Sequence, residues 1–584
     1  MTNLKMKTGL LVRIVTVLLL AALLGACSNA EQSQTPLKAI SMAWPRDVGP
    51  LNPHLYTPSE MFAQSMVYDS LVSYGANGEI EPALAESWEI SDDGLTYTFH
   101  LRQGVRYSDG SAFDADNAVR NFEAILANRN RHSWMGIVRH IGEVNKVDEH
   151  TIRLRLTDYY YPVLQDLSFV RPFRFLADAG FPEDGKTSET IAGPIGTGPW
   201  KLKEYKKDEY AIFERNEHYW GDKPRLEQIT VKIIPDPESI VMAFEKGDIG
   251  LIYGQGVISR DSFQYLKDSG KYGVALSEGL NTRGIIMNTQ MDGTSELAVR
   301  RAIQYGIDKD ALLQNITKGT ELKADTALGR NVPYADLDLK PIDYDPGKAR
   351  QLLDEAGWKL DPGSGIRMKQ GRPLKLKFVY IETEAVQKQM AEVIQGDLAK
   401  IGIKLDLQGA EVMLGLQMLR NGEANMNFWS SYGTPNDPHN FATVIATPTM
   451  DGLYEAFSGL PEKAEMDGIV QKALISKNDE ERSRLYAELL SRIHEQAVIY
   501  PISYEANAAV YQPQLTGVQI PLPVGNDRRC SISGWADDTV YFQTSGRTAV
   551  CAAGCVPPDF SAGPAGARGA GGSDSAAVEL ARDR

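Results

Sequence analysis

The stretch from 374 to 407 constrains the fold more than any other part of the chain. Apolar and polar residues alternate at 374–380 and again at 403–407, which is typical of strands with one buried face. Between these runs, apolar residues recur at helical spacing from 386 to 401, and Gly402 ends the pattern. Because two strands joined by a helix of this length pair in parallel, the sequence predicts an α/β fold.

Shorter segments predict further strands and helices on either side of this unit. We expect a strand at 39–44, a hairpin over 86–101, and a turn at 196–200 that leads into another strand. A long helix is expected at 479–496, followed by a strand at 498–502 that returns toward the first part of the chain. With 584 residues, the chain is long enough for about two or three domains.

Composition excludes several classes of function. The net charge is −15, from 61 Lys and Arg against 76 Asp and Glu, which argues against nucleic acid as a partner. None of the four cysteines falls between Ser28 and Asp527, so the body has neither a disulfide nor a thiolate metal site. The eight histidines form no HxxxH or HExxH spacing, and no GxSxG motif is present. The sequence therefore predicts a protein that is not an enzyme and has no permanent cofactor.

The first 27 residues have the order of a bacterial lipoprotein signal. Lys5, Lys7 and Arg13 precede a short apolar run at 14–24, which is too short to span a bilayer. The following Leu24-Gly25-Ala26-Cys27 resembles a lipobox, in which Cys27 is acylated and becomes the mature N-terminus. We expect residues 28–38 to be a tether and the body to work outside the inner membrane, in the periplasm or on the outer face of the cell membrane, held to a bilayer by lipid. The alternative is an ordinary secretory signal.

The stretch from Asn128 to Phe175 carries the main candidate site. Arg171 lies in an apolar, proline-stiffened run, Val170 to Phe175, where a permanent charge needs an anionic or hydrogen-bonded partner. The planar guanidinium suits a carboxylate, and the face of Trp134 suits a cation or a flat ring. We therefore predict a pocket for a small ligand that bears carboxylates. The alternative is an internal salt bridge, with Trp134 as ordinary core packing.

Two loops supply further candidates. Tyr56, Thr57 and Met61 lie where a proline-rich loop meets a helix, a common place for ligand contacts. The loop 429–439, broken by Pro and Gly, contains Tyr432, Asn436 and His439 in a composition that often lines binding sites. For both loops the alternative is packing or a surface connection.

From Ala43 to about Pro523 the chain resembles the extracytoplasmic solute-binding proteins of peptide/nickel-type ABC importers, family 5. The motifs are Glu86-Ser87-Trp88, Gly196-Thr197-Gly198-Pro199-Trp200, Arg215-Asn216-Glu217-His218-Tyr219-Trp220, the helix from Val299 to Lys309, and Tyr344-Asp345-Pro346 through Ala356-Gly357-Trp358. Within the family the chain is similar to the branch that binds nickel and opine metallophores, through 48–58, 129–134, 171–175 and Asp437-Pro438-His439.

This resemblance implies a two-lobe periplasmic-binding-protein fold of class II, with an extra subdomain in lobe I and a hinge between the lobes. The implied boundaries are lobe I at 39–280 with its subdomain at about 75–190, lobe II at 281–499, and a return to lobe I at 500–526. The implied partners are the permease and ATPase subunits of an importer, and we expect a monomer. A function of another class, that of a secreted hydrolase, would need a nucleophile and a base, and neither can be identified in the sequence.

For the ligand, the resemblance implies nickel, or cobalt or zinc, carried as a small organic chelate. The branch's carboxylate-gripping arginine falls on Arg171 and its stacking tryptophan on Trp134. Other pocket positions match Arg131, Tyr56, Thr57 and Met61. Where relatives that coordinate the metal directly have a histidine, this chain has Met450, and Asn436 replaces a tyrosine. These departures argue against direct coordination, leave His439 and Met450 as weak candidates, and make a fully wrapped opine metallophore a serious variant.

Two further expectations follow. The alternative within the same family is a protein that binds di- or oligopeptides, which need a strand-like slot and main-chain pairing. From Asp527 to Arg584 the chain becomes rich in Gly, Ala and Pro and the resemblance ends, so we expect a disordered tail. A shifted reading frame or a fusion would explain it equally well. If lobe I needs a closing strand near its C-terminus, the change in composition raises the question of whether the chain has one.

Overall fold

The computed structural model describes residues 38–55, 60–75, 78–277, 279, 281–431, 437–449, 451–515 and 518. The chain divides into two units, Met1–Thr544 and Ser545–Arg584, and every described residue belongs to the first. Several predicted features lie outside the described residues and stay predictions: Cys27, Tyr56, Thr57, Tyr432, Asn436, Met450 and the tail from 527. Among the described helices, none combines the length and apolarity needed to cross a membrane.

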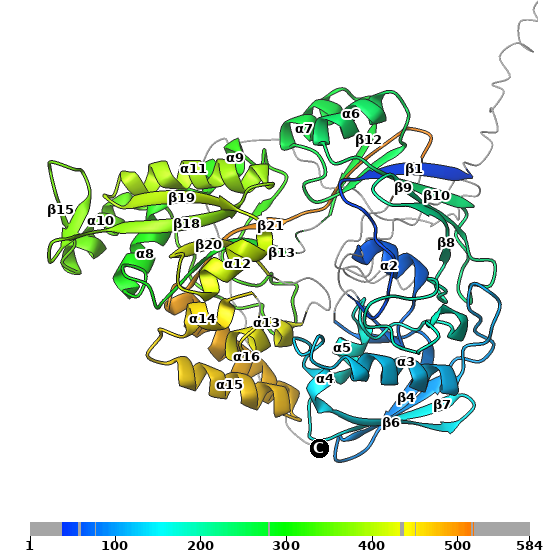
Figure 1. Ribbon diagram of the computed structural model, residues 1–584. Coiled ribbons are helices and arrows are strands. Elements are labelled where there is room, and N and C mark those ends of the chain that lie inside the picture. The colour runs from blue at the N-terminus through cyan, green and yellow to red at the C-terminus, as the bar shows by residue number, and fades with distance from the viewer. Residues whose placement is uncertain are drawn as a thin grey trace, which may run out of the picture. The chain divides into compact units, whose positions relative to one another are not determined.

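A seven-stranded mixed sheet forms the first half of the fold (Figure 1). In spatial order its strands are β12 (Gly273–Leu276), β22 (Ala508–Tyr511), β11 (Leu251–Gly254), β1 (Ala39–Trp44), β10 (Gln228–Ile233), β9 (Tyr210–Arg215) and β8 (Trp200–Lys206). Its two faces are covered by different helices, α2 (Met61–Val67) on one and α6 (Pro237–Glu245) with α7 (Arg260–Asp268) on the other. Side chains that alternate along β1 and β11 pack in turn against α2 and against α6 and α7.

A six-stranded sheet forms the second half. In spatial order its strands are β14 (Leu322–Lys323), β21 (Ile499–Glu505), β13 (Asn281–Met287), β20 (Met426–Ser430), β18 (Lys375–Ile381) and β19 (Lys404–Ala410). β18 and β19 pair in parallel, with Phe378 opposite Leu407, and α11 (Ala385–Ala399) joins them. The predicted strand–helix–strand unit is therefore confirmed. The helices α8 (Leu297–Gly306) and α10 (Pro346–Glu355) share a core with this sheet.

A four-stranded antiparallel sheet lies between residues 85 and 156. Its order is β4 (Ala85–Ile90), β5 (Thr96–Leu101), β7 (Thr151–Leu156) and β6 (Ile141–Asp148), which confirms the predicted hairpin. The helix α3 (Ala115–Ala127) begins after Asp114, whose side chain accepts a hydrogen bond from the Asn117 amide as an N-cap. α4 (Ile137–His140) and α5 (Val163–Ser168) follow.

The remaining elements are short or belong to helical layers. They are β2 (Val72–Tyr74), β3 (Ile80–Pro82), η1 (Asp178–Gly180), α9 (Lys309–Asn315), β15 (Lys359–Leu360), β16 (Arg367–Lys369), β17 (Arg372–Pro373), α12 (Val412–Arg420), α13 (Pro438–Ala446), α14 (Leu453–Phe457), α15 (Lys463–Ile475) and α16 (Asp479–Glu495). The hydrophobic cluster that covers the four-stranded sheet continues into α13, α15 and α16, so residues far apart in sequence share one core.

Two passages of the chain connect the seven-stranded sheet to the six-stranded sheet. β12 leads into β13 through residues 277–280, and β21 leads into β22 through 506–507. The two passages are hydrogen-bonded to each other, because the Ser277 amide donates to the Asn507 carbonyl at 2.9 Å and the Asn507 amide donates to Ser277 Oγ at 2.8 Å. Two sheets of mixed α/β topology joined by a paired connection are the predicted two-lobe architecture. The implied lobe boundaries stay predictions.

Buried charges lie beside this connection. Arg260 of α7 donates to Glu321 Oε1 at 2.9 Å, and Arg283 of β13 lies 3.3 Å from the same oxygen. Arg283 also pairs with Glu505 at the end of β21. All four side chains are less than 10% exposed, so this cluster of two positive and two negative charges is a built part of the connection.

The motif Gly196-Thr197-Gly198 has a structural role next to α2. A Cβ at Gly196 would collide with the Val67 carbonyl at the end of that helix, and the Gly198 amide donates to the same carbonyl at 2.8 Å. Thr197 Oγ1 donates to Asp69 at 2.9 Å. This close approach of two main chains requires glycine, which explains the tight turn that the sequence predicted.

Two local predictions were wrong. Because serine is a favoured N-cap, the sequence predicts Ser59 as the cap of the helix that carries Met61, whereas α2 has Glu60 as its N-cap, without a side-chain hydrogen bond. The loop predicted at 429–439 is shorter, because Trp429 lies in the strand β20 and His439 lies in the helix α13. Both residues are buried, so neither belongs to an open loop.

Candidate functional site

The turn that follows α3 brings Trp134 next to the segment around Arg171. Trp134 is half-buried, and its ring packs edge-on against Phe169, with centroids 5.7 Å apart and an angle of 73° between the ring planes. Phe169 lies two residues before Arg171 in the chain. The two ends of the stretch from 128 to 175 therefore meet in space, so that an aromatic ring and a guanidinium lie in one neighbourhood.

Arg171 connects this neighbourhood to the helix α2. It is half-buried, it precedes a cis peptide bond to Pro172, and its Nη1 donates to Gln64 Oε1 at 3.4 Å. Gln64 lies in α2, 107 residues earlier in the chain, and is fully buried. α2 begins at Met61, another candidate, which is half-buried at its first turn. The structure thus brings Met61, Gln64 and Arg171 to one region.

A second arginine of the same run is buried behind this region. Arg174 is 3% exposed, and its Nη2 donates to the main-chain oxygen of Ser168 at 3.2 Å. Arg131 is exposed on the turn before Trp134. Since guanidinium groups stay protonated at any physiological pH, Arg131, Arg171 and Arg174 contribute permanent positive charge to a protein whose net charge is negative.

Two buried histidines lie among these arginines and are neutral. Burial lowers the pKa of His54 to about 4. Burial, and to a lesser extent the electrostatic effect of His54 and Arg131, lowers the pKa of His132 to about 4. His54 Nε2 lies 3.1 Å from the Arg174 carbonyl, which can only accept, so this nitrogen carries the proton. His54 Nδ1 then accepts from Thr187 Oγ1 at 2.8 Å. At neutral pH these two histidines therefore add no positive charge to that of the three arginines.

His439, a weak metal candidate from the sequence, is committed to two carboxylates. Its Nε2 lies 2.9 Å from Asp166 Oδ1 and its Nδ1 lies 2.8 Å from Asp437 Oδ1, in a fully buried setting. Burial alone would lower the pKa of His439, but Asp437 and Asp166 raise it to about 9. An imidazolium has no lone pair for a metal, so this setting argues against His439 as a ligand, and its role as one stays a prediction.

The partners of His439 extend this network. Tyr161 donates to Asp437 at 2.9 Å, and Asp166 Oδ2 accepts from the Ile137 amide and from the Tyr160 hydroxyl, each at 2.9 Å. The network ties α5 to α13 across 273 residues of sequence. No local pattern in the sequence marks Asp166 as the partner of His439.

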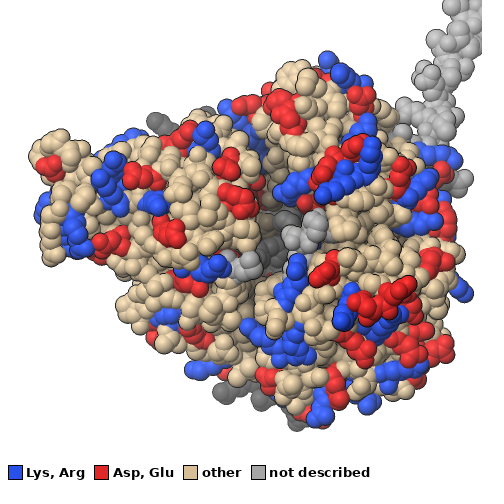
Figure 2. Space-filling model, viewed as in Figure 1, with Lys and Arg blue, Asp and Glu red and all other residues tan. Residues whose placement is uncertain are grey.

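Within the ranges that the structure describes, no three His, Cys, Asp or Glu side chains converge to hold a metal ion. Figure 2 shows that one face of the molecule is hollowed near its centre, between the part that carries β13 and β20 and the part that carries α2, with Lys and Arg side chains beside the hollow. The sequence analysis named Arg171 and Trp134 but missed Gln64, which accepts a hydrogen bond from Arg171. A glutamine among the apolar residues of α2 was the available signal.

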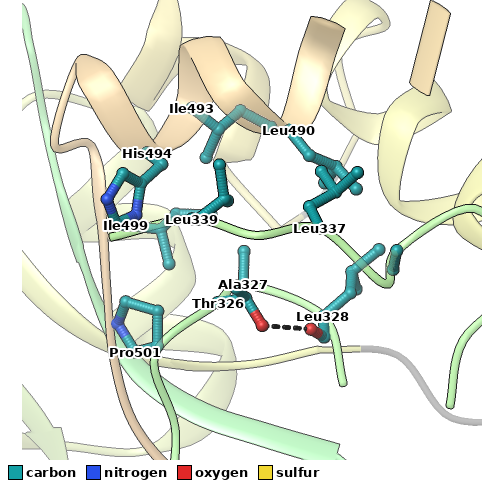
Figure 3. A pocket seen from close by; sticks show the side chains of 11 residues that line it. Thr326, Ala327, Leu328, Leu337, Leu339, Leu490, Ile493, His494, Ile499 and Pro501 are labelled. Carbon is teal, nitrogen blue, oxygen red and sulfur yellow. Dashed lines mark hydrogen bonds between the residues drawn. The ribbon is translucent and has the colours of Figure 1, made fainter. Parts of the chain in front are cut away.

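A small pocket elsewhere is part of the core. It measures about 10 Å³ and is lined mainly by apolar side chains, among them Leu328, Leu337 and Leu490, as Figure 3 shows. A space of this size holds about one water molecule. It is therefore too small for an organic ligand.

Comparison with known proteins identifies the family. The model of bacterial extracellular solute-binding proteins, family 5 (middle region), matches residues 79–452. The nickel-binding periplasmic protein of Escherichia coli K12 is 43% identical over 500 residues, covering 85% of this chain and 95% of that protein. The dipeptide-binding protein of the same organism is 28% identical over 491 residues, covering 79% and 88%.

A solved structure gives the same result. The crystal structure of NikA from Brucella suis in complex with Fe(III)-EDTA matches with a TM-score of 0.81 and 45% sequence identity, covering 82% of this chain and 97% of that one. The match thus spans both sheets of the fold and the connection between them. The chain belongs to the bacterial extracellular solute-binding proteins of family 5.

Proposed function

We propose that this protein captures nickel as a small organic chelate and delivers it to the permease of an ABC importer. As a family 5 solute-binding protein it works outside the cytoplasm with permease and ATPase subunits, and it is not an enzyme. The chelator in this proposal is of the histidine type or an opine metallophore, and cobalt or zinc could be carried in the same way.

The observation that carries the proposal is the placement of Arg171. The half-buried Arg171 bonds to Gln64 of α2, the helix that begins at Met61, and Trp134 packs on Phe169, two residues before Arg171. The exposed Arg131 lies three residues before Trp134. Such a region suits an anionic, partly flat solute, because a guanidinium can pair with carboxylates and an aromatic face can stack on a ring. The similarity to a nickel-binding protein and to NikA holding a polycarboxylate chelate supports this choice of solute.

We propose further that the chelator supplies the metal's ligands. His439 is protonated between two aspartates and has no nitrogen to offer, which leaves the protein to recognise the outside of the chelate. Tyr56, Thr57, Tyr432 and Asn436 are proposed to contact that outer surface. Met450 offers a thioether, a poor ligand for Ni²⁺ beside imidazole.

We propose that the mature protein is a monomer anchored by lipid at Cys27. The order of charged residues, apolar run and lipobox in the first 27 residues supports the anchor. An anchored binding protein keeps its solute close to the permease, because the tether at 28–38 limits how far the body can diffuse.

Titration of the purified protein tests the proposal. We expect reversible binding of Fe(III)-EDTA, and of nickel in the presence of L-histidine or an opine metallophore. Free nickel should bind much more weakly than these chelates. R171A should weaken the binding of these chelates at least tenfold, because a charge-assisted hydrogen bond is lost. R153A, which removes an exposed arginine of β7, is the matched control. Unchanged affinity in R171A would refute the assignment.

The second candidate is a protein that binds di- or oligopeptides. The 28% identity to a dipeptide-binding protein favours it as the alternative. Dipeptides added without metal distinguish the two. Tight binding of peptide that is insensitive to R171A would favour this second function over the first.

A further inference from the structure

The amide of Gln64 holds one orientation in the structure. Its Nε2 donates to the main-chain oxygen of Asn52 at 2.6 Å and to that of Leu55 at 3.3 Å. Because both acceptors are carbonyls, which cannot donate, the nitrogen must face them. The oxygen Oε1 is then left to face Arg171 Nη1, at 3.4 Å. A flipped amide would place its oxygen against two carbonyls and its nitrogen against a guanidinium.

We propose that Gln64 is a positioning residue for solute capture, which holds the Arg171 guanidinium toward the solute. The inference rests on the proposed function, because Gln64 can position Arg171 for capture only if Arg171 contacts the solute. An amide oxygen orients a guanidinium without adding a negative charge, whereas a glutamate in the same place would compete with the carboxylates of the solute.

The burial of Gln64 makes it suitable for this task. The side chain is fully buried in α2, and the neighbouring Phe62, Met66 and Val67 anchor the helix in the core beneath the seven-stranded sheet. A buried amide with both ends bonded cannot change rotamer without leaving buried hydrogen-bonding groups without partners, which is costly. The guanidinium therefore has a fixed acceptor on its inner side.

Gln64 also holds the loop that precedes Tyr56, and this structural role has to be separated from the first. Tyr68, one helical turn further along, donates its hydroxyl to the Leu51 carbonyl of the same loop at 3.0 Å. Y68F therefore removes a hydrogen bond between α2 and this loop and leaves the hydrogen bond between Gln64 and the Arg171 guanidinium in place. This makes Tyr68 a matched control for the structural role of Gln64.

A double-mutant cycle tests the inference. The wild type, Q64M, R171A and Q64M/R171A are titrated with Fe(III)-EDTA and with nickel plus L-histidine by isothermal titration calorimetry. We expect Q64M to weaken binding roughly tenfold in the wild-type background and to cause no further loss in the R171A background, because Gln64 acts through Arg171. For Y68F we expect the same fold-change in both backgrounds. Equal losses from Q64M in both backgrounds would overturn the inference.

A second variant keeps the test decisive if Q64M does not fold, as judged by circular dichroism. Q64E has nearly the same shape and places a carboxylate beside the guanidinium, but like Q64M it loses the donors to the Asn52 and Leu55 carbonyls. We therefore expect a loss of at least tenfold for the anionic Fe(III)-EDTA in the wild-type background and a clearly smaller loss in the R171A background. Wild-type affinity in Q64E would count against the inference. Failure of the proposed function looks different: R171A itself would bind as the wild type does, or the wild type would bind no chelate.

Discussion

Replacing Glu321 by glutamine is expected to destabilise the connection between the two sheets by about 3–5 kcal/mol. The Glu321 side chain is completely buried and accepts hydrogen bonds from Arg260 at 2.9 Å and from Ser503 Oγ at 2.6 Å. Arg283 is shared between Glu321 and Glu505. E321Q leaves two buried arginines with one glutamate, and removing one member of a buried ion pair typically costs about 3–5 kcal/mol.

A second substitution checks that charge balance is the cause. In R260M/E321Q the remaining Arg283 and Glu505 still form a pair, so the cluster is neutral again. We therefore expect the double variant to be more stable than E321Q alone. The control is E227Q, which breaks an exposed ion pair between Lys38 and Glu227. The Lys38 side chain is 68% exposed and that of Glu227 is 48% exposed. E227Q should change the free energy of unfolding by at most about 1 kcal/mol.

Urea unfolding gives the required free energies. Tryptophan fluorescence and far-ultraviolet circular dichroism are followed together, because linear extrapolation applies only where the two transitions coincide. The reasoning is refuted if E321Q lies within about 1 kcal/mol of the wild type, or if R260M/E321Q is less stable than E321Q.

Three further predictions concern other parts of the chain. His439 has a folded-state pKa of about 9 against an ordinary 6.5, so its contribution of roughly 3 kcal/mol is fully present below pH 6.5 and is lost as the pH rises through about 9. H439Q should therefore flatten the decline in the free energy of unfolding between these two pH values, and an unchanged decline would contradict this. D69N should cost about 1–3 kcal/mol, because Asp69 accepts from Trp220 Nε1 at 2.8 Å and from Thr197 Oγ1 at 2.9 Å; a melting temperature equal to that of the wild type would argue against it. C27A should abolish incorporation of radiolabelled palmitate, and retained label would place the lipid elsewhere.

The elements that were predictable have strong local patterns. In the strand–helix–strand unit from 374 to 407, apolar residues recur with a period of two, then of 3.6, then of two again. Gly402 or a change of period marks where each element ends. The strand at 39–44 has the predicted bounds. The cap of α2 was misplaced by one residue, because serine is a favoured cap but Glu60 occupies the position without using its side chain. Trp429 was assigned to a loop because the Pro and Gly residues that follow the short strand β20 dominate the pattern there.

The candidate site was predictable only in part. A charged arginine in a proline-rich apolar run and a tryptophan near it are unusual enough to be seen in the sequence. The contacts that define their surroundings connect residues more than 100 positions apart, as between Gln64 and Arg171 or between Asp166 and His439. Such pairings depend on how the sheets stack, and local propensity carries no information about them.

The position of β22 has a consequence for the order in which the chain can fold. This strand inserts between β12 and β11 in the interior of the seven-stranded sheet, and it comes after every strand of the six-stranded sheet. The six-stranded sheet can therefore be complete while the seven-stranded sheet still has a gap beside its edge strand β12, which closes only once Ala508–Tyr511 pairs with β11 and β12. The closing strand also precedes residue 527, where the composition changes, so the chain contains the strand that seals its first sheet.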